Sequence, residues 1–166
     1  MTNILKPTSL SATEKKASKK PIKKKSKRRK GRFHTGIYNS LKCKKPIGYR
    51  SGWELVVCES LDLDPNVIEY FYEDLIIPYK TKPTQIKNKR YIIDFFVIYA
   101  DGTKKIIEVK ADHKVNHYLT LHKTAAAKKW CQQHNVEYEI WSSQKIKELV
   151  KEQKEIQKTN KDFQSL

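Results

Sequence analysis

The sequence of 166 residues lacks the features of several common classes of protein. It has no run of about 18 apolar residues, so no membrane-spanning helix is expected. No apolar segment typical of a secretory signal follows Met1. Three cysteines, Cys43, Cys58 and Cys131, include no C-x-x-C spacing, which argues against a disulfide scaffold and for a reducing compartment. We therefore expect a cytoplasmic protein that is not exported by a signal peptide.

Motifs of several enzyme classes are missing too. There is no Gly-rich phosphate loop, which argues against nucleotide hydrolysis, and no G-x-S-x-G elbow. Three histidines lie close together in the sequence, but neither an H-E-x-x-H motif nor an adjacent cysteine accompanies them. Surface histidines are therefore favoured over a zinc site at His113, His117 and His122.

The formal net charge of +17 is unevenly distributed. Residues 1–32 carry 13 Lys and Arg against the single acid Glu14, a net of +12, which leaves +5 for residues 33–166. The first segment lacks apolar periodicity, which predicts a disordered basic arm. Such an arm favours a polyanion through counterion release, and double-stranded DNA is the expected partner. A nuclear-import signal and an anionic-membrane patch are the alternatives. The expected DNA-binding residues are Lys23, Lys24, Lys25, Lys27, Arg28, Arg29, Lys30 and Arg32.

After residue 33 the pattern predicts alternating helices and strands. Ser51 can cap a helix that ends by Pro65. The segment Lys80 to Lys89 is polar and basic, and an exposed loop there could reach a phosphate backbone. Further helices are expected over residues 117–134 and 143–157, and strands over residues 67–72, 75–79 and 136–141. The order predicts an α/β fold, a mixed β-sheet flanked by helices.

Two apolar runs on either side of Asp101-Gly102 predict a central hairpin. The first run, residues 91–99, is apolar on both faces and is expected to form one buried strand with Asp94 as its only charge. The second run places Glu108 and Lys110 on one face, because side chains alternate along a strand. The charges of Asp94, Glu108 and Lys110 could belong to a metal site or to a simple ion pair.

The register of this hairpin decides where Asp94 lies. A two-residue turn would place Asp94 opposite Val109, with Glu108 on the other face. A three-residue loop with Gly102 as a left-handed bulge would place Asp94 opposite Glu108. We favour the second register, which brings Asp94, Glu108 and Lys110 together.

Two opposed carboxylates repel each other, so a cation is expected between them. A divalent ion with oxygen ligands could be held by Asp94, Glu108 and the backbone carbonyl of Val109, and Lys110 would then orient a water or stabilise charge on phosphorus. The alternative is a buried ion pair of Lys110 with Asp94 or Glu108 that only fixes the register. Glu54, in the first turn of the first helix, either interacts with the helix dipole or acts as a further acid at the metal.

An ordered series of motifs resembles the TnsA-type endonuclease domain over roughly residues 49–142. The series is YRSGWE from Tyr49, LDPNV from Leu63, IIPY from Ile76, YIIDF from Tyr91, YADGT from Tyr99, IEVK from Ile107 and AAKKWC from Ala126. The resemblance implies a restriction-endonuclease-like fold and the PD-(D/E)xK chemistry of DNA cleavage with Mg²⁺, for which Mn²⁺ can substitute. It implies Glu54, Asp94 and Glu108 as acids, with Glu54 acting directly or through water, and Lys110 as the catalytic lysine.

The chain departs from the family pattern at two positions. Ile93 stands where a proline usually precedes the Asp, and Glu108 stands where transposon members carry Gln. Only about 24 residues follow Trp141, whereas transposase subunits usually carry a further C-terminal domain. We therefore expect a phage head-completion nuclease, acting in the host cytoplasm or virion, with phage head or portal proteins as further partners.

The expected organisation is a basic arm (1–32), a lead-in segment (33–48), a nuclease core (49–142) and a C-terminal helix and tail (143–166). The alternatives are a non-catalytic DNA-binding virion protein, a transposon-end endonuclease and a junction or repair nuclease. The sequence leaves the oligomeric state open.

Overall fold

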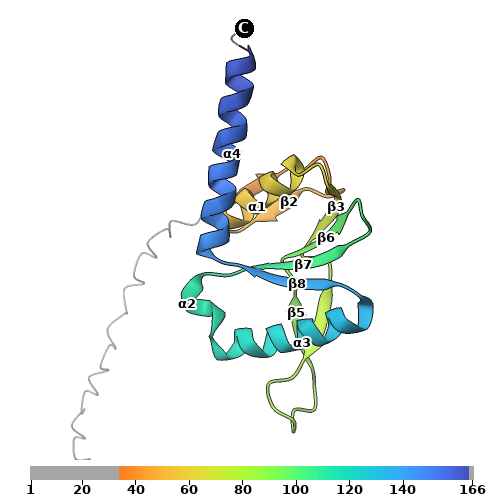
Figure 1. Ribbon diagram of the computed structural model, residues 1–166. Helices are drawn as coiled ribbons and strands as arrows, with labels where there is room; N and C mark the ends of the chain where they lie inside the picture. The colour runs from red at the N-terminus through yellow and green to blue at the C-terminus, as the bar shows by residue number, and fades with distance from the viewer. Residues whose placement is uncertain (1–33, 165–166) are drawn as a thin grey trace, which may run out of the picture. The chain divides into compact units, whose positions relative to one another are not determined.

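A mixed four-stranded sheet forms the centre of the protein, of which a computed structural model describes residues 34–164 (Figure 1). The strand order is β3-β6-β7-β8, and the chain enters the sheet through antiparallel pairs before β8 adds parallel to β7. The parallel pair confirms the predicted crossover through a helix. These strands are β3 (Val67–Tyr72), β6 (Phe95–Tyr99), β7 (Lys104–Val109) and β8 (Glu137–Trp141).

Helices cover both faces of this sheet, as the α/β pattern predicts. α1 (Gly52–Leu63) and α4 (Ser143–Gln164) share one apolar core with the sheet, which includes Val57, Phe95, Ile107 and Leu149. α3 (Tyr118–His134) covers the other face through a second core that contains Ile106, Ala127 and Cys131. Figure 1 shows α3 running along the lower side of the sheet, away from α1 and α4.

The helix ends lie where the sequence places their caps. The Ser51 hydroxyl accepts a hydrogen bond from the Glu54 amide at 3.2 Å, and α1 stops at Asp64 before Pro65. Asn135 ends α3 in the left-handed conformation, with φ of 52°, which confirms the predicted C-cap. α4 is longer than expected and continues to Gln164.

Short elements surround this framework. β1 (Gly36–Tyr38) and β2 (Ile47–Tyr49) pair in the segment before α1, and α2 (Asp112–Val115) occupies the predicted linker after β7. The basic arm and its eight expected DNA-binding residues, Lys23 to Arg32, lie outside the described residues. Within residues 34–164, no helix is long and apolar enough to cross a membrane.

The expectation of one continuous strand over residues 91–99 is wrong. β5 (Lys89–Ile92) pairs with β4 (Ile76–Tyr79) in a separate two-stranded hairpin, and β6 begins only at Phe95. Tyr72 pairs with Phe95, and Ile76 pairs with Ile92. The chain therefore advances four residues from Tyr72 to Ile76 but only three from Ile92 to Phe95, so the first segment contains one extra residue.

The extra residue is a β-bulge at Glu73. Its φ of 50° lies in the left-handed region, and its amide donates to the Asp94 carbonyl at 3.0 Å. A bulge bends a strand pair and shifts its register by one residue. The bend therefore takes β4 and β5 out of the central sheet and leaves Ile93 and Asp94 at the junction.

Candidate active site

The turn between β6 and β7 sets the register of the site. The Tyr99 amide donates to the Thr103 carbonyl at 2.9 Å, and the Gly102 amide donates to the Tyr99 carbonyl at 3.0 Å. Gly102 has φ of 84°, a conformation that costs glycine little because it has no Cβ. The three-residue loop, and not the two-residue turn, is therefore confirmed.

This register brings the predicted charges together at the end of β7. Phe95 and Ile107 form the last pair of the β6–β7 ladder, and the residues one step beyond them, Asp94 and Glu108, interact through their charges. Lys110 follows Glu108 by two residues, on the α3 side of the sheet. Its ammonium contacts the Glu108 carboxylate, with 2.6 Å between Nζ and Oε1. The site thus contains two acids and one lysine on one face.

Glu108 is the most buried acid in the described part of the chain, with only 2% of its surface exposed. Besides the Lys110 contact at Oε1, its Oε2 accepts a hydrogen bond of 2.6 Å from the Tyr91 hydroxyl. Both carboxylate oxygens are therefore satisfied by fixed donors, which sets the orientation of the group.

Asp94 is held less completely. Its Oδ2 accepts a hydrogen bond of 2.8 Å from the Val109 amide, and no other described residue donates a hydrogen bond to this carboxylate. Burial and the neighbouring charge of Glu108 raise the pKa of Asp94 to about 7, although the Val109 amide and Lys110 act in the opposite direction. An anionic Asp94 is thus costly here without a further cation.

The pKa of Lys110 is raised. Burial alone would lower it, but the charge and the hydrogen bond of Glu108, together with Asp94, outweigh that effect. The ammonium is therefore fully protonated at neutral pH. In the metal-free protein this group is therefore a hydrogen-bond donor.

Glu54 lies at the edge of this group, at the start of α1. Its Oε2 accepts hydrogen bonds from the Tyr72 hydroxyl at 2.7 Å and the Arg50 amide at 2.8 Å, and its Oε1 accepts one from Ser51. These bonds give Glu54 a capping role at the N-terminus of α1. Its charge also contributes to the raised pKa of Asp94, which places it within electrostatic reach of the pair.

The structure adds residues to the site that sequence reasoning missed. The Tyr138 hydroxyl lies 3.4 Å from the hydroxyls of both Tyr91 and Thr124, so polar groups continue from Glu108 to α3. The Lys123 ammonium lies 5.0 Å from the centre of the Tyr91 ring. In a single strand over residues 91–99, Tyr91 and Asp94 would lie on opposite faces. The bend after Ile92 brings Tyr91 to Glu108, and nothing in the local sequence signals it.

The donor set fits a hard divalent cation better than zinc. Within the described residues, no three His, Cys, Asp or Glu side chains lie close enough to hold a metal. Mg²⁺ commonly uses only one or two protein carboxylates and keeps several waters. The opposed pair Asp94 and Glu108, with one Asp94 oxygen unpartnered, meets that requirement.

The three histidines considered for a zinc site, His113, His117 and His122, have contacts that do not involve a metal. His117 caps α3 by accepting from the Leu119 amide at 3.3 Å, and the His122 ring contacts the ring of Tyr118. His113 is exposed on α2.

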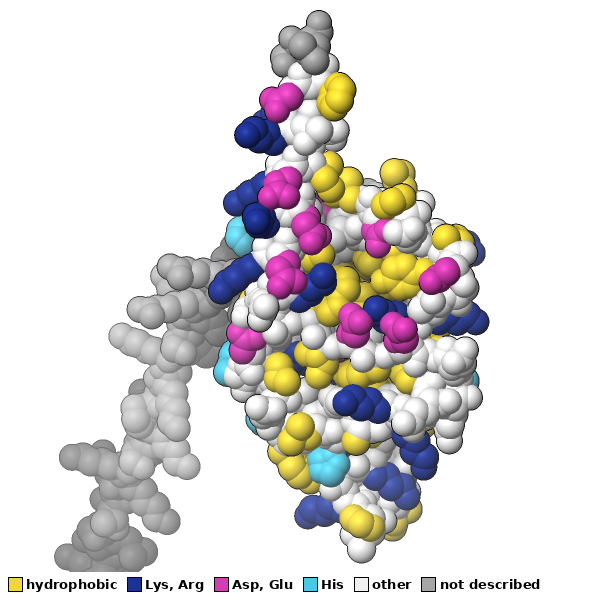
Figure 2. All heavy atoms as spheres, viewed as in Figure 1, with side chains coloured by type: hydrophobic (Ala, Val, Ile, Leu, Met, Phe, Trp, Pro, Cys, Tyr) yellow, Lys and Arg dark blue, Asp and Glu magenta, His cyan; other side chains and the backbone are white. Residues whose placement is uncertain are grey.

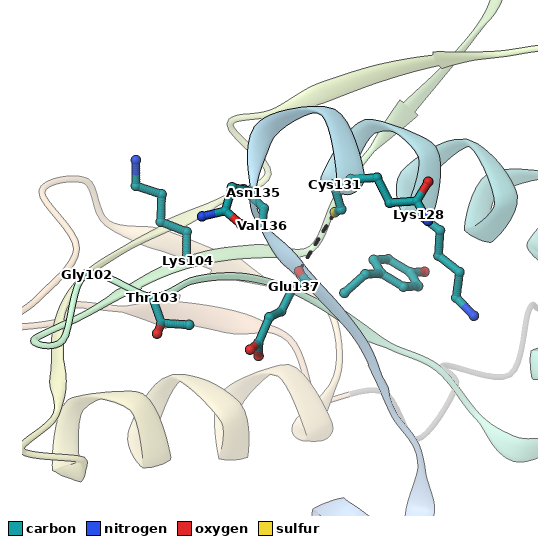
Figure 3. A pocket seen from close by; sticks show the side chains of 10 residues that line it. Gly102, Thr103, Lys104, Lys128, Cys131, Asn135, Val136 and Glu137 are labelled. Carbon is teal, nitrogen blue, oxygen red and sulfur yellow. Dashed lines mark hydrogen bonds between the residues drawn. The ribbon is translucent and has the colours of Figure 1, made fainter.

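A pocket of about 430 Å³ lies at the other end of the sheet (Figure 3). It is lined by the β6–β7 turn, the end of α3 and the start of β8, including Gly102, Lys128 and Glu137. The Cys131 thiol points to the Glu137 carbonyl beside it, at 3.8 Å. Glu54, Asp94, Glu108 and Lys110 do not line this pocket, although Tyr138 does, so the carboxylate site lies at the opposite end of the sheet.

Comparison with known proteins agrees with the motif series. Residues 64–143 match a family model described as the TnsA-like endonuclease N-terminal domain. Asp94, Glu108 and Lys110 lie inside this segment, and Glu54 precedes it. The predicted TnsA-like, restriction-endonuclease-like α/β fold is confirmed.

The chain is also similar to a curated phage protein. It is 35% identical over 86 residues to the "Head completion nuclease" of Enterobacteria phage T4. The match covers 51% of this chain and 57% of the relative, so the chain spans less than two thirds of the length of that protein.

Proposed function

We propose that this chain is a metal-dependent DNA endonuclease that hydrolyses phosphodiester bonds. One observation carries the proposal: Asp94 and Glu108 oppose each other beside Lys110, within a TnsA-like segment. A structural ion pair would need one acid for one lysine. The second acid leaves a negative charge that a divalent cation would compensate.

Asp94, Glu108 and the Val109 carbonyl would hold Mg²⁺ or Mn²⁺, with Glu54 contributing through a water, since no three acids among the described residues lie close enough to share one ion directly. When bound, such an ion lowers the pKa of a coordinated water and offsets charge on the phosphate. The chain's own contribution is orientation. Tyr91 and Lys110 fix the two oxygens of Glu108, and the Val109 amide fixes Asp94.

Lys110 has a defined role in this proposal. Its ammonium lies beside the two proposed metal ligands, 2.6 Å from the Glu108 carboxylate, where it would donate a hydrogen bond to the substrate. It would stabilise the negative charge that develops on the phosphate oxygens during attack. Glu108 holds its ammonium at 2.6 Å and so keeps it beside the metal ligands.

The setting we propose is phage head completion, with packaged or protruding DNA as substrate and head or portal proteins as partners. The support is the similarity to the T4 protein of that name, over roughly half of each chain. The protein would then act in the host cytoplasm or in the virion.

The test is cleavage of supercoiled and linear duplex DNA with Mg²⁺, with Mn²⁺ and with EDTA. Asp94→Ala and Lys110→Ala should each lower the cutting rate by about 100-fold or more while DNA binding is retained. The matched control is Lys104→Ala, which removes an exposed lysine from the other end of β7. Binding without metal-dependent cutting in the unmodified protein would refute the proposal and favour a structural DNA-binding protein. Equal loss of binding in both variants would contradict the catalytic assignment.

A further inference from the structure

The hairpin formed by β4 and β5 carries an uncompensated positive charge. Between Asp74 and Asp94 the chain has no acidic residue. Its basic side chains are all exposed, and no described acid lies within ion-pair distance of them. They are Lys80, Lys82, Lys87, Lys89 and Arg90. In Figure 2, dark-blue side chains gather at the lower end of the domain, where the visible face has no magenta ones.

The shape of the loop is fixed by its own hydrogen bonds. The side-chain oxygen Oε1 of Gln85 accepts hydrogen bonds from the Thr81 backbone amide, at 3.2 Å, and from the Thr81 hydroxyl, at 3.0 Å. The side-chain nitrogen Nε2 of Gln85 donates to the Lys87 backbone carbonyl. The Tyr118 hydroxyl at the start of α3 donates to the Thr81 carbonyl at 3.0 Å. The lysines are therefore presented from a loop that is tied to the domain.

The hairpin leads directly to the candidate site. β5 ends two residues before Asp94, and Tyr91 within β5 contacts Glu108. Lys87, near the end of the loop, precedes Asp94 by seven residues, at most about 24 Å at the rise of a strand. Each base pair of duplex DNA adds about 3.4 Å along the axis, so this reach corresponds to about seven base pairs. Phosphates within that distance of a strand held at Asp94 and Glu108 would pass the basic loop. Figure 1 shows this loop projecting beyond α3.

We propose that the β4–β5 hairpin is a second DNA-binding element, which holds the phosphate backbone of duplex DNA beside the cleavage site. The inference rests on the proposed nuclease function, since it takes DNA as the substrate. The contacts of the hairpin with DNA would be electrostatic and independent of the DNA sequence, because the lysine ammonium groups would bind phosphates and not base edges.

The experiment compares two full-length triple variants of equal charge. In the hairpin variant Lys80, Lys82 and Lys87 are replaced by Gln. In the control variant Lys154, Lys158 and Lys161, exposed on α4, are replaced by Gln. All six side chains are exposed, so both variants should keep the unfolding temperature of the unmodified protein.

Binding to a 30-base-pair duplex is measured by fluorescence anisotropy in EDTA over a series of KCl concentrations. Each lost phosphate contact lowers the slope of log affinity against log salt by about 0.9, so the hairpin variant should lose about 2 to 3 from the slope and the control less than about 1. Equal slopes for the two variants would overturn the proposal, and would leave an acidic protein surface as the partner of the hairpin.

Cleavage with Mg²⁺ is followed in parallel, so that the two proposals can fail separately. If the unmodified protein cuts DNA and the hairpin variant binds and cuts with unchanged salt dependence, the hairpin inference fails and the nuclease stands. If none of the three proteins cuts DNA, but only the hairpin variant shows a smaller slope of log affinity against log salt, the DNA-binding role of the hairpin stands without the nuclease function.

Discussion

Replacing Asp94 by Asn should stabilise the metal-free protein. The pKa of Asp94 is raised from 3.8 to about 7 by burial and by Glu108, so the folded state keeps this proton at pH values where the unfolded state has lost it. Stability from this group is complete below about pH 4 and is lost as pH rises through about 7. Asn has the same shape, can accept the Val109 hydrogen bond and carries no charge.

The magnitude follows from the shift. About 3 pKa units at 1.36 kcal/mol each correspond to a cost on the order of 4 kcal/mol for the anionic form above pH 7. The free energy of unfolding of Asp94→Asn minus that of the unmodified protein should therefore be near zero at pH 4 and rise toward this value at pH 8.

The assay is denaturant unfolding in EDTA at a series of pH values. All other carboxylates are common to both proteins, so the difference reports the titration of Asp94 together with its effect on the neighbouring Glu108. The control is Asp101→Asn in the turn between β6 and β7, where the Thr103 amide lowers the pKa of the exposed Asp101 carboxyl. The free energy of unfolding of Asp101→Asn minus that of the unmodified protein should not rise with pH. A difference for Asp94→Asn that stays flat, or that falls with pH, would refute the reasoning. Adding Mg²⁺ at pH 8 should reduce the difference in the free energy of unfolding between the two proteins, because only the unmodified protein has the Asp94 carboxylate to bind the ion.

Three further results are expected. Tyr91→Phe removes the hydroxyl that orients Glu108 and should weaken Mn²⁺ binding about 10- to 100-fold in a calorimetric titration, whereas an unchanged affinity would contradict the positioning role. Ile107→Ala empties a fully buried position and should lower the free energy of unfolding by about 2–5 kcal/mol, with the exposed Ile92→Ala as the smaller control. Deleting residues 1–32 should weaken DNA binding and flatten its salt dependence, and an unchanged slope would assign the arm to another partner.

Much of the fold could be predicted because its signals are local. Ser51 and Asn135 mark helix ends through their own hydrogen bonds and backbone angles. Asp101 and Gly102 determine a turn within a few residues, and the turn alone brings Asp94 to Glu108.

The bend between the central sheet and the hairpin could not be predicted in the same way. It depends on a bulge at Glu73, and glutamate carries no preference for the left-handed region that it adopts there. The sequence predicts that one strand ends at Tyr72 and the next begins at Leu75. That the opposite strand is also interrupted, between Ile92 and Phe95, depends on pairing between segments far apart in the sequence. For this reason the contact of Tyr91 with Glu108 was missed, although both residues belong to the motif series.

The separation of β4 and β5 from the central sheet has a consequence for the evolution of such domains. Their ladder is separate from the β6–β7 ladder, so insertions or deletions in the loop between Lys80 and Asn88 leave the pairing of β6 with β7 untouched. Exchange of this loop between relatives would thus change the basic side chains that it presents while Asp94, Glu108 and Lys110 keep their positions. The loop of such a domain can therefore vary in length and charge without displacing the residues at the end of β7.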